Sequence, residues 1–298
     1  MSTIFRDKVT IENPGVGVMG FNDMTFLPFW YAGTSVMAVD TLDGWDKTVS
    51  LNVISVPRGV GDGAYTAPKF PALARNLTIG GYVHTADRSA MEHVWDQIVA
   101  DAFPADTDLI LTRYETIPKY VTCRVASEME LTQYFPDQAV FRWEGTLLCS
   151  DPFKYDATNT LFDSGGISGL SIGGRTYPRV YPLTYTVVAG GEGNQAVISN
   201  IGTAKAYPLF TLYGPIPSGW HIDNVTTGAS LAFDLDLGVG DVLVIDVKNK
   251  YATLNGFTVN GLVTGTWMQL VRGTNVLKLF ADYNATAYFT VSAKSTWR

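Results

Sequence analysis

The segment Asp87–Phe103 carries hydrophobic residues at steps of three and four, which is typical of a helix with one apolar face. Ser89 and Glu92 have the spacing of a capping box, and Pro104 ends the pattern. The sequence therefore predicts one amphipathic helix here. Its apolar stripe consists of Met91, Val94, Trp95, Ile98, Val99 and Ala102.

Hydrophobic and polar residues alternate on both sides of this helix, and alternation predicts strands. The expected strands span 77–83, 109–111, 120–124 and 140–148. Strands, one helix and further strands predict an α+β domain that ends near Asp151-Pro152-Phe153. The Gly- and Ser-rich run from Asp163 to Gly174 favours a connector or an exposed loop.

The rest of the chain shows alternation alone, interrupted by turn residues such as Gly214-Pro215 and Asn255-Gly256. Repeated strands without a helical segment predict an antiparallel β-sandwich. We therefore expect a mainly β protein with two domains, 1–155 and 156–298, joined by a connector at about 156–180. The expected strands of the second domain span 183–187, 207–213, 231–237, 242–246 and 287–291.

Composition and charge narrow the possible functions. The chain has 298 residues, of which 46% are hydrophobic and only 16% charged, so it can fill a large core and is not a disordered chain. Residues 1–153 hold 11 Lys and Arg against 19 Asp and Glu, a net charge of −8, whereas residues 154–298 hold 10 against 9. Phosphate binding needs clustered cations, so specific nucleic-acid binding is not expected. An acidic domain could instead line a passage through which nucleic acid slides.

The cysteines and the apolar segments predict a cytosolic folding environment. Cys123 and Cys149 form no CxxC pair and are expected to be free, buried thiols. The first residues lack a basic segment followed by an apolar run, so no secretory signal is expected. The most apolar stretch, Phe26–Val39, is interrupted by Pro28 and Gly33 and is too short to span a bilayer, so we expect no membrane insertion.

Patterns that would indicate a nucleophile, a zinc site or a phosphate loop are missing from the sequence. No G-x-S-x-G motif occurs, and the spacing of His84, His93 and His221 fits no zinc signature. The glycine-rich run Arg58–Gly63 lacks the lysine and the helix that a phosphate loop requires. It favours a hairpin or an extended loop.

Two groups of carboxylates are candidates for a cation site or a catalytic pair. Asp40, Asp43 and Asp46 surround a turn and could hold a hard cation, but their spacing matches no calcium loop, and a solvated acidic turn is favoured. Asp234 and Asp236 face one side of an expected strand, which favours a wet surface over a glycosidase pair. We therefore expect no catalytic, cofactor-binding or metal-binding residues, and a protein that buries surface against partners rather than an enzyme.

The order of turns and strands in the second half resembles a known family, the distal tail proteins of long-tailed, non-contractile bacteriophages, also called siphovirus tail components or minor tail proteins. The similarity lies in a series of short motifs. They are Ala206-x-Pro208-x-Phe210-x-Leu212-x-Gly214, Asp223-Asn224-x-Thr226-Thr227-Gly228, Gly240-Asp241-x-Leu243-x-Ile245-Asp246, Leu254-Asn255-Gly256 and Trp267-x-x-Leu270.

The first half is similar to the family in the order of its parts. An arginine with a glycine-rich loop, an Arg-led strand, one helix and a closing Asp-Pro-Phe follow one another in the family pattern. Arg58 with Gly59–Gly63, Arg75–Gly81, the expected helix and Asp151–Phe153 occupy these positions.

The resemblance implies a structural virion protein without catalysis or cofactor. It implies a ring of six copies at the tail tip, with N-terminal domains that have a tail-tube-like β-barrel fold and C-terminal galectin-like sandwiches that project outward. One face would join the major tail tube protein and the other the hub, which is associated with the tape measure and receptor-binding proteins. Assembly would occur in the host cytoplasm, and DNA would pass through the ring. The alternative function is a carbohydrate-binding module for host glycans in the C-terminal sandwich.

One loop is expected to contact a neighbouring subunit. The segment 57–72 is long, glycine-rich and weakly charged, which predicts that it becomes ordered only against another subunit or ring. The residues expected to make this inter-subunit contact are Arg58, Gly59, Gly61, Asp62, Gly63 and Tyr65.

Overall fold

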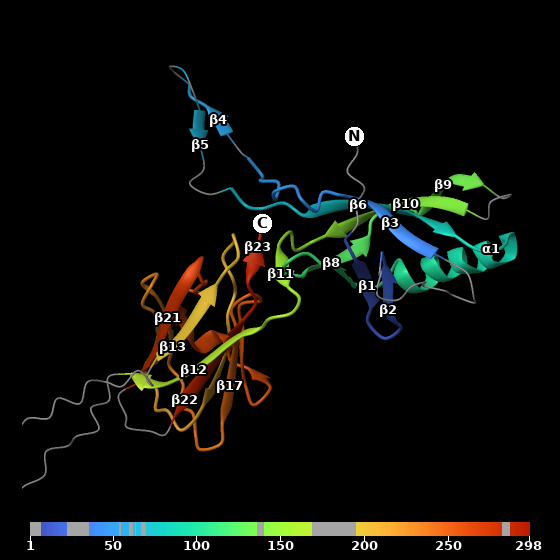
Figure 1. Ribbon diagram of the computed structural model, residues 1–298. Helices are drawn as coiled ribbons and strands as arrows, with labels where there is room; N and C mark the ends of the chain where they lie inside the picture. Colours follow the sequence, from blue (N-terminus) through green and yellow to red (C-terminus); the bar gives the residue numbers. More distant parts are fainter. Residues whose placement is uncertain are drawn as a thin grey trace, which may run out of the picture. The chain divides into compact units, whose positions relative to one another are not determined.

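The computed structural model divides the chain into two units (Figure 1), which comprise residues 1–158 with Arg298 and residues 159–297. The residues that the structure describes are 7–22, 36–53, 55–59, 62, 64–66, 70–135, 140–168, 195–281 and 287–298. Among these, no helix is long and apolar enough to cross a membrane.

The N-terminal unit is built around a sheet in which the strand order is β2-β1-β7-β8-β10-β6-β3. β9 pairs with β10, and β11 pairs with β8. The bounds of the elements are β1 (Val9–Asn13), β2 (Gly17–Phe21), β3 (Val36–Asp43), β4 (Ser55–Pro57), β5 (Ala64–Thr66), β6 (Arg75–His84), α1 (Arg88–Gln97), a π-helical turn (Ile98–Ala102), β7 (Leu109–Arg113), β8 (Lys119–Val125), β9 (Glu130–Phe135), β10 (Val140–Cys149) and β11 (Lys154–Asp156).

The long strands β6 and β10 alternate their side chains between core and surface, as the sequence predicts. They pair antiparallel from Val140 opposite His84 to Cys149 opposite Arg75. The strand pairings among the described residues follow an open path from β2 to β3 and do not close into the expected barrel. The mainly β class with an α+β N-terminal unit is confirmed.

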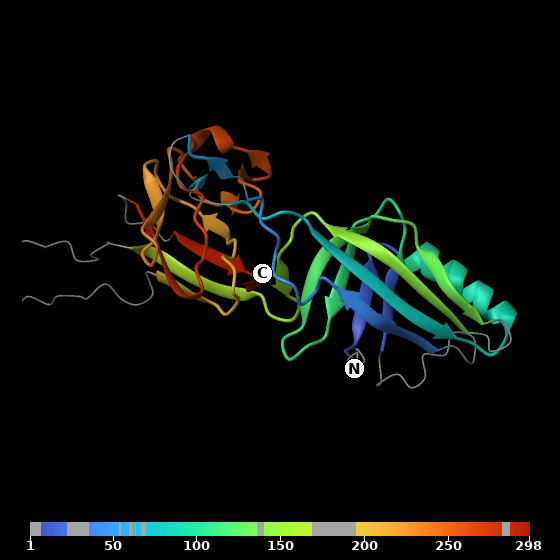
Figure 2. The same cartoon turned by 90° about the horizontal axis from the view of Figure 1, so that it is seen from above.

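The predicted helix is confirmed, but its cap differs from the prediction. Asp87, not Ser89, is the N-cap, and its Oδ1 accepts a 2.8 Å hydrogen bond from the backbone N–H of Ala90. Glu92 forms an ion pair with Arg88 instead of closing a capping box. Within the predicted stripe Met91, Val94, Ile98 and Ala102 are buried, whereas Val99 is exposed. Figure 2 shows α1 lying along one side of the strands of its unit.

The C-terminal unit consists almost wholly of antiparallel strands in the order β19-β18-β17-β14-β22-β12-β21-β15-β16-β20, with β13 paired to β21. β12 pairs antiparallel with β22 and parallel with β21 and so joins the two halves. The bounds are β12 (Leu161–Ser168), β13 (Gln195–Asn200), β14 (Leu209–Tyr213), β15 (Trp220–Asn224), β16 (Ala229–Phe233), β17 (Val242–Asp246), β18 (Tyr251–Leu254), β19 (Phe257–Thr258), a 3₁₀ turn (Asn260–Leu262), β20 (Val263–Gly265), β21 (Gly273–Phe280), β22 (Tyr288–Ala293) and β23 (Thr296–Trp297).

The two halves of this sheet share one core, in which Phe210 and Phe289 from one half meet Trp220 and Phe233 from the other. The Trp220 and Phe233 rings stack at 4.6 Å between centroids. The two layers therefore face each other across buried aromatic side chains, as expected of a sandwich.

Two expectations for this unit are wrong. Asp163–Ser168, predicted as part of a connector or loop, belongs to β12, because its backbone completes the ladder with β22. The strand predicted over 231–237 ends at Phe233, and Leu237 instead forms a bridge to Ile216. The strand expected at 183–187 lies outside the described residues.

Candidate functional site

Exposed apolar side chains of the N-terminal unit occur on a hairpin arm, which we define as residues 50–73. In its outer part β4 pairs with β5, with Val56 opposite Tyr65. At its base the backbone N–H of Leu73 donates to the carbonyl of Ser50 at 2.8 Å. In both views the β4–β5 hairpin stands away from the sheet of its own unit (Figure 1 and Figure 2).

The predicted inter-subunit loop falls on this hairpin arm. Arg58, Gly59, Asp62 and Tyr65 are described, whereas Gly61 and Gly63 lie outside the described residues. The Arg58 guanidinium lies over the Tyr65 ring, 5.5 Å from its centroid, so the two side chains form a cation–π pair.

Apolar side chains of the hairpin arm are open to solvent. Val56 and Tyr65 are 58% and 65% exposed. Exposed apolar side chains that follow one another along a narrow arm are suited to burial against another surface. The further exposed members are Leu51, Val53 and Leu73.

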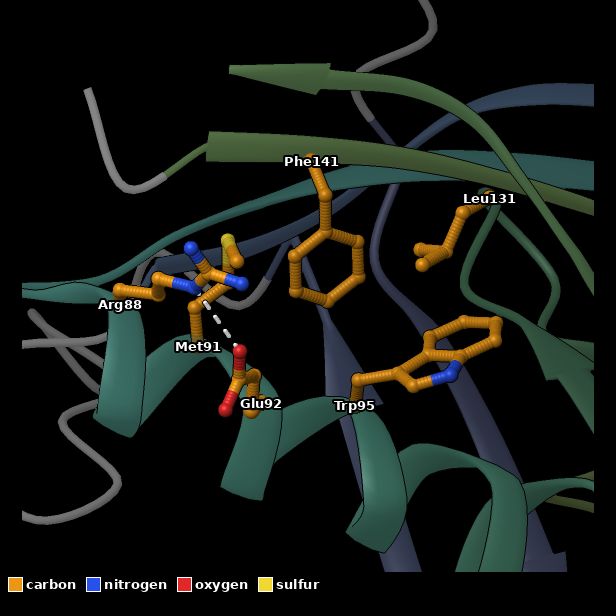
Figure 3. A pocket seen from close by; sticks show the side chains of 6 residues that line it. All are labelled: Arg88, Met91, Glu92, Trp95, Leu131 and Phe141. Carbon is orange, nitrogen blue, oxygen red and sulfur yellow. Dashed lines mark hydrogen bonds and ion pairs between the residues drawn. The ribbon is translucent and has the colours of Figure 1, made fainter. Parts of the chain in front are cut away.

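An apolar pocket of about 360 Å³ lies between α1 and the strands β9 and β10 (Figure 3). Trp95 and Phe141 form its wall in an edge-to-face contact, with ring centroids 5.6 Å apart. Its charged lining residues, Arg88 and Glu92, pair with each other at 2.9 Å. Because these two charges neutralise each other, the lining suits an apolar side chain and not acid–base chemistry. Met91 and Leu131 complete the lining.

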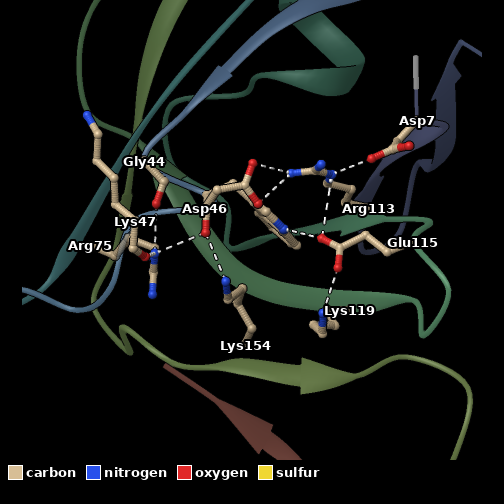
Figure 4. Close-up of polar contacts among 10 residues, drawn as sticks. Asp7, Gly44, Asp46, Lys47, Arg75, Arg113, Glu115, Lys119 and Lys154 are labelled. Carbon is tan, nitrogen blue, oxygen red and sulfur yellow. Dashed lines mark hydrogen bonds and ion pairs between the residues drawn. The ribbon is translucent and has the colours of Figure 1, made fainter. Parts of the chain in front are cut away.

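A network of charged side chains joins several segments of the same unit (Figure 4). The Arg113 guanidinium lies 2.8 Å from Asp7 and 3.0 Å from Asp46. Glu115 lies 3.5 Å from Arg113 and accepts hydrogen bonds from the Lys119 ammonium at 2.6 Å and the Trp45 indole at 2.7 Å. Burial opposes the charge on Glu115, but the hydrogen bonds of Lys119 and Trp45 outweigh it, and the pKa of Glu115 is lowered.

Two buried cations in this region bind backbone carbonyls. The Arg75 guanidinium donates to the carbonyls of Gly44 at 2.7 Å, Lys47 at 2.8 Å and Pro152 at 2.9 Å. The Lys154 ammonium donates to the carbonyl of Trp45 at 2.8 Å. Burial, with repulsion from Arg75 and Lys119, lowers the pKa of Lys154 to about 8. These cations fasten the turn after β3 to the sheet, and this is a structural role.

The Arg75 contacts also connect two segments that carry the family resemblance. Arg75 begins the Arg-led strand, and Pro152 is the centre of the closing Asp-Pro-Phe. The sequence places them far apart, and nothing in their spacing indicates that they meet. Two parts of the family pattern, the Arg-led strand and the closing Asp-Pro-Phe, are therefore joined by a hydrogen bond within the N-terminal unit.

The candidate catalytic and metal-binding groups are not brought together. Asp40 pairs with Arg142 at 2.7 Å, Asp43 with Lys47 at 2.7 Å, and Asp46 with Arg113, so the acidic turn is divided among three cations. Of the residues that the structure describes, no three His, Cys, Asp or Glu form a group that could hold a metal ion.

The remaining candidates also have local partners or lie apart. Asp236 accepts a hydrogen bond from the backbone N–H of Ser218 and lies beyond the end of β16. His84 lies at the end of β6 and His93 in α1, while His221 lies in β15 of the other unit, 3.7 Å from Asp223. In the described residues, the candidate sites are therefore the exposed hairpin arm and the apolar pocket.

Residues 201–297 match a protein family, the C-terminal domain of the siphovirus-type tail component (SPP1_Dit). Residues 201–297 of the C-terminal unit are thus similar to the siphovirus-type tail component domain. This confirms the resemblance predicted from the motifs of the second half. No curated protein sequence matches the chain.

Solved structures extend the likeness to the whole chain. The crystal structure of the SPP1 Dit protein (gp 19.1), a paradigm of the hub adsorption apparatus in phages that infect Gram-positive hosts, matches with a TM-score of 0.64 and 13% identity, covering 97% of this chain and 99% of that one. At this identity the match establishes a shared fold, in which a second unit accompanies the tail component domain.

Two structures of the phage P2 baseplate in its activated conformation match less well. The structure with Ca has a TM-score of 0.43 and 11% identity and covers 97% of this chain and 98% of that one. The structure with Sr has a TM-score of 0.43 and 13% identity, with 96% and 97% covered.

Proposed function

We propose that this protein is a structural component of the distal end of a siphophage tail, where six copies form a ring between the tail tube and the hub. The observation that carries the proposal is the fold likeness to SPP1 Dit over almost the full length of both chains, together with the family match of residues 201–297. In this role the protein would join other parts of the tail, and we assign it no catalytic role.

The charge of the N-terminal unit is consistent with a ring that DNA passes through. Residues 1–153 have a net charge of −8, whereas the remaining residues have a net charge of +1. A ring of acidic units repels the phosphates of DNA, which then passes without binding. Specific nucleic-acid binding forms no part of the proposal.

The hairpin arm is the surface that we assign to contact between neighbouring subunits. Its exposed Val56 and Tyr65 gain burial when a second surface covers them. Arg58 adds a cation beside the Tyr65 ring, and this cation suits an acidic surface such as that of another N-terminal unit. A closed ring would also remove exposed sheet edges.

The proposed position at the distal end of the tail determines which partners we propose. One ring face would contact the major tail tube protein, and the other would contact the hub, which is associated with the tape measure and receptor-binding proteins. Copies would assemble in the host cytoplasm and reside at the tail tip. We propose no catalytic residue and no cofactor, and the comparisons favour a structural tail role over the alternative of host-glycan recognition.

Negative-stain electron microscopy of the purified full chain tests the ring directly. The proposal predicts closed rings with six-fold averages and a central hole. A field of separate two-lobed particles at every concentration would contradict it.

The double variant R58A/Y65A tests the hairpin arm. We expect the variant to keep the unfolding midpoint of the natural chain, because the side chains of Arg58 and Tyr65 contact solvent in the isolated protein. We expect it to form no rings. The matched control K47A/E92A removes two exposed charges elsewhere in the unit and should form rings normally. Limited proteolysis is a second test: equal cleavage of residues 57–72 in free and assembled protein would exclude an inter-subunit role.

A further inference from the structure

The two cysteines of the chain lie opposite each other on neighbouring strands. β8 and β10 pair Leu148 with Arg124 and Leu147 with Val125. Continuing this antiparallel register by one residue pairs Cys149, the last residue of β10, with Cys123 in β8. Their side chains project to the same face of the sheet, where both belong to the core of the N-terminal unit.

The hydrogen bonds between these strands determine which kind of pair this is. The backbone N–H of Ala126 donates to the carbonyl of Thr146 at 2.8 Å, which makes these two residues a hydrogen-bonded pair. Hydrogen-bonded and non-hydrogen-bonded pairs alternate along an antiparallel ladder. Cys123 and Cys149 are therefore at the next, non-hydrogen-bonded position of this register. In regular ladders, Cα atoms at such positions are about 4.5 Å apart and side chains are closest.

The thiols are buried and in contact. Cys123 is 2% exposed and Cys149 is 0% exposed. A hydrogen bond with Cys149 raises the pKa of Cys123, and burial raises it further. In the closed sheet the Cys123 thiol thus stays protonated and both cysteines are shielded from solvent, so they react only when the strands open or before they close.

We propose that Cys123 and Cys149 are a redox-active pair that forms a reversible cross-strand disulfide by exchange with a low-molecular-weight disulfide such as oxidised glutathione. The position meets the geometric requirement, because disulfides span Cα separations of about 4.4–6.8 Å. The inference depends on the register of the N-terminal unit alone and holds whether or not the protein belongs to a tail.

The exchange has two balanced steps. One cysteine thiolate attacks a sulfur of oxidised glutathione, forming a mixed disulfide and releasing one glutathione thiolate. The second cysteine thiolate attacks the protein sulfur of that mixed disulfide and releases the second glutathione. The protein thiols lose two electrons and two protons, and one glutathione disulfide becomes two glutathione thiols.

Refolding the full chain in oxidised glutathione tests the proposal, because glutathione can reach the two thiols before the core closes. After refolding, the protein is denatured, alkylated, digested and analysed by mass spectrometry. We expect a peptide that links Cys123 to Cys149, no alkylated cysteine, and loss of the link on treatment with dithiothreitol. The oxidised chain should also unfold at a higher denaturant concentration than the reduced chain, because the link constrains the unfolded state.

The variants C123A and C149A are matched controls, because each keeps one thiol in the same environment. They should give no linked peptide and no oxidation-dependent shift of the unfolding midpoint. Two alkylated cysteines in the natural chain after refolding would overturn the proposal. Glutathione that remains attached to either cysteine would overturn it equally, because the second thiol would then have failed to reach the first.

Discussion

The indole Nε1 of Trp45 donates a 2.7 Å hydrogen bond to Oε1 of Glu115. Trp45 lies in the turn that follows β3 and is fully buried, while Glu115 follows β7. The same carboxylate accepts a hydrogen bond from Lys119. One half-buried carboxylate therefore links a core aromatic side chain to the charged network of Arg113.

Replacing Trp45 with phenylalanine keeps an aromatic ring but removes this hydrogen bond and part of the core volume. We expect the free energy of unfolding to fall by about 2–3 kcal/mol, because a buried polar partner is lost together with packing. Chemical denaturation measures this difference. The control W95F should cost less, since Trp95 is only partly buried against the core. Equal costs for the two variants would show that the Glu115 bond contributes nothing.

Replacing Arg75 with methionine leaves three backbone carbonyls without their donor. Buried acceptors without partners are costly, so we expect a loss of about 3 kcal/mol or more in the free energy of unfolding. Arg88 is exposed and forms an ion pair with the exposed Glu92. R88M is therefore the control and should change the stability by about 0.5 kcal/mol or less. A small effect at both positions would contradict the structural role of Arg75.

The lowered pKa of Lys154 predicts a specific dependence of stability on pH. Between about 8, its pKa in the folded chain, and 10.5, its ordinary value, the unfolded chain binds more protons than the folded chain. Stability contributed by this group therefore rises as the pH increases through that window. Below pH 8 the lysine is charged in both states and its burial is a constant cost.

The variant K154M isolates this effect, because other groups titrate equally in both proteins. From pH 8 to 10 we expect the natural chain to gain about 1–3 kcal/mol of unfolding free energy relative to K154M. Urea denaturation at several pH values gives the difference. A difference that stays constant with pH would show that the pKa of Lys154 is not lowered.

Gly202 packs against the backbone near the end of the C-terminal unit. A Cβ atom added there would lie far inside van der Waals contact of the Thr296 carbonyl oxygen, and this backbone atom cannot move as a side chain can. We expect G202A to lower the midpoint of thermal unfolding by several degrees. Gly261 has no atom close to the corresponding position, so G261A should leave the midpoint almost unchanged.

Elements with strong periodicity could be predicted from the sequence. The helix could be predicted because its apolar stripe repeats from Met91 to Ala102, and β10 and β17 because alternation persists along each strand. β12 was missed because glycine and serine give no alternating pattern. Its ladder with β22 comes from distant residues, which a local pattern does not reveal.

The candidate site could likewise be predicted only in part, because local patterns do not reveal contacts between distant residues. The composition of the loop around Arg58 favoured a hairpin or an extended loop, and the structure pairs β4 with β5 there. The network of Arg113, Glu115 and Trp45 could not be predicted, because its members are brought together only by the strand order. The expectation that Cys123 and Cys149 are free, buried thiols is confirmed. That they lie on neighbouring strands could not be predicted, since their spacing in the sequence contains no information about the register of β8 and β10.

Native mass spectrometry of the purified full chain tests the central claim, namely assembly of copies into a closed ring, most directly. The account predicts a discrete species with the mass of six chains that dissociates in the R58A/Y65A variant. A chain that remains a single copy over the full accessible range of concentration would contradict the account.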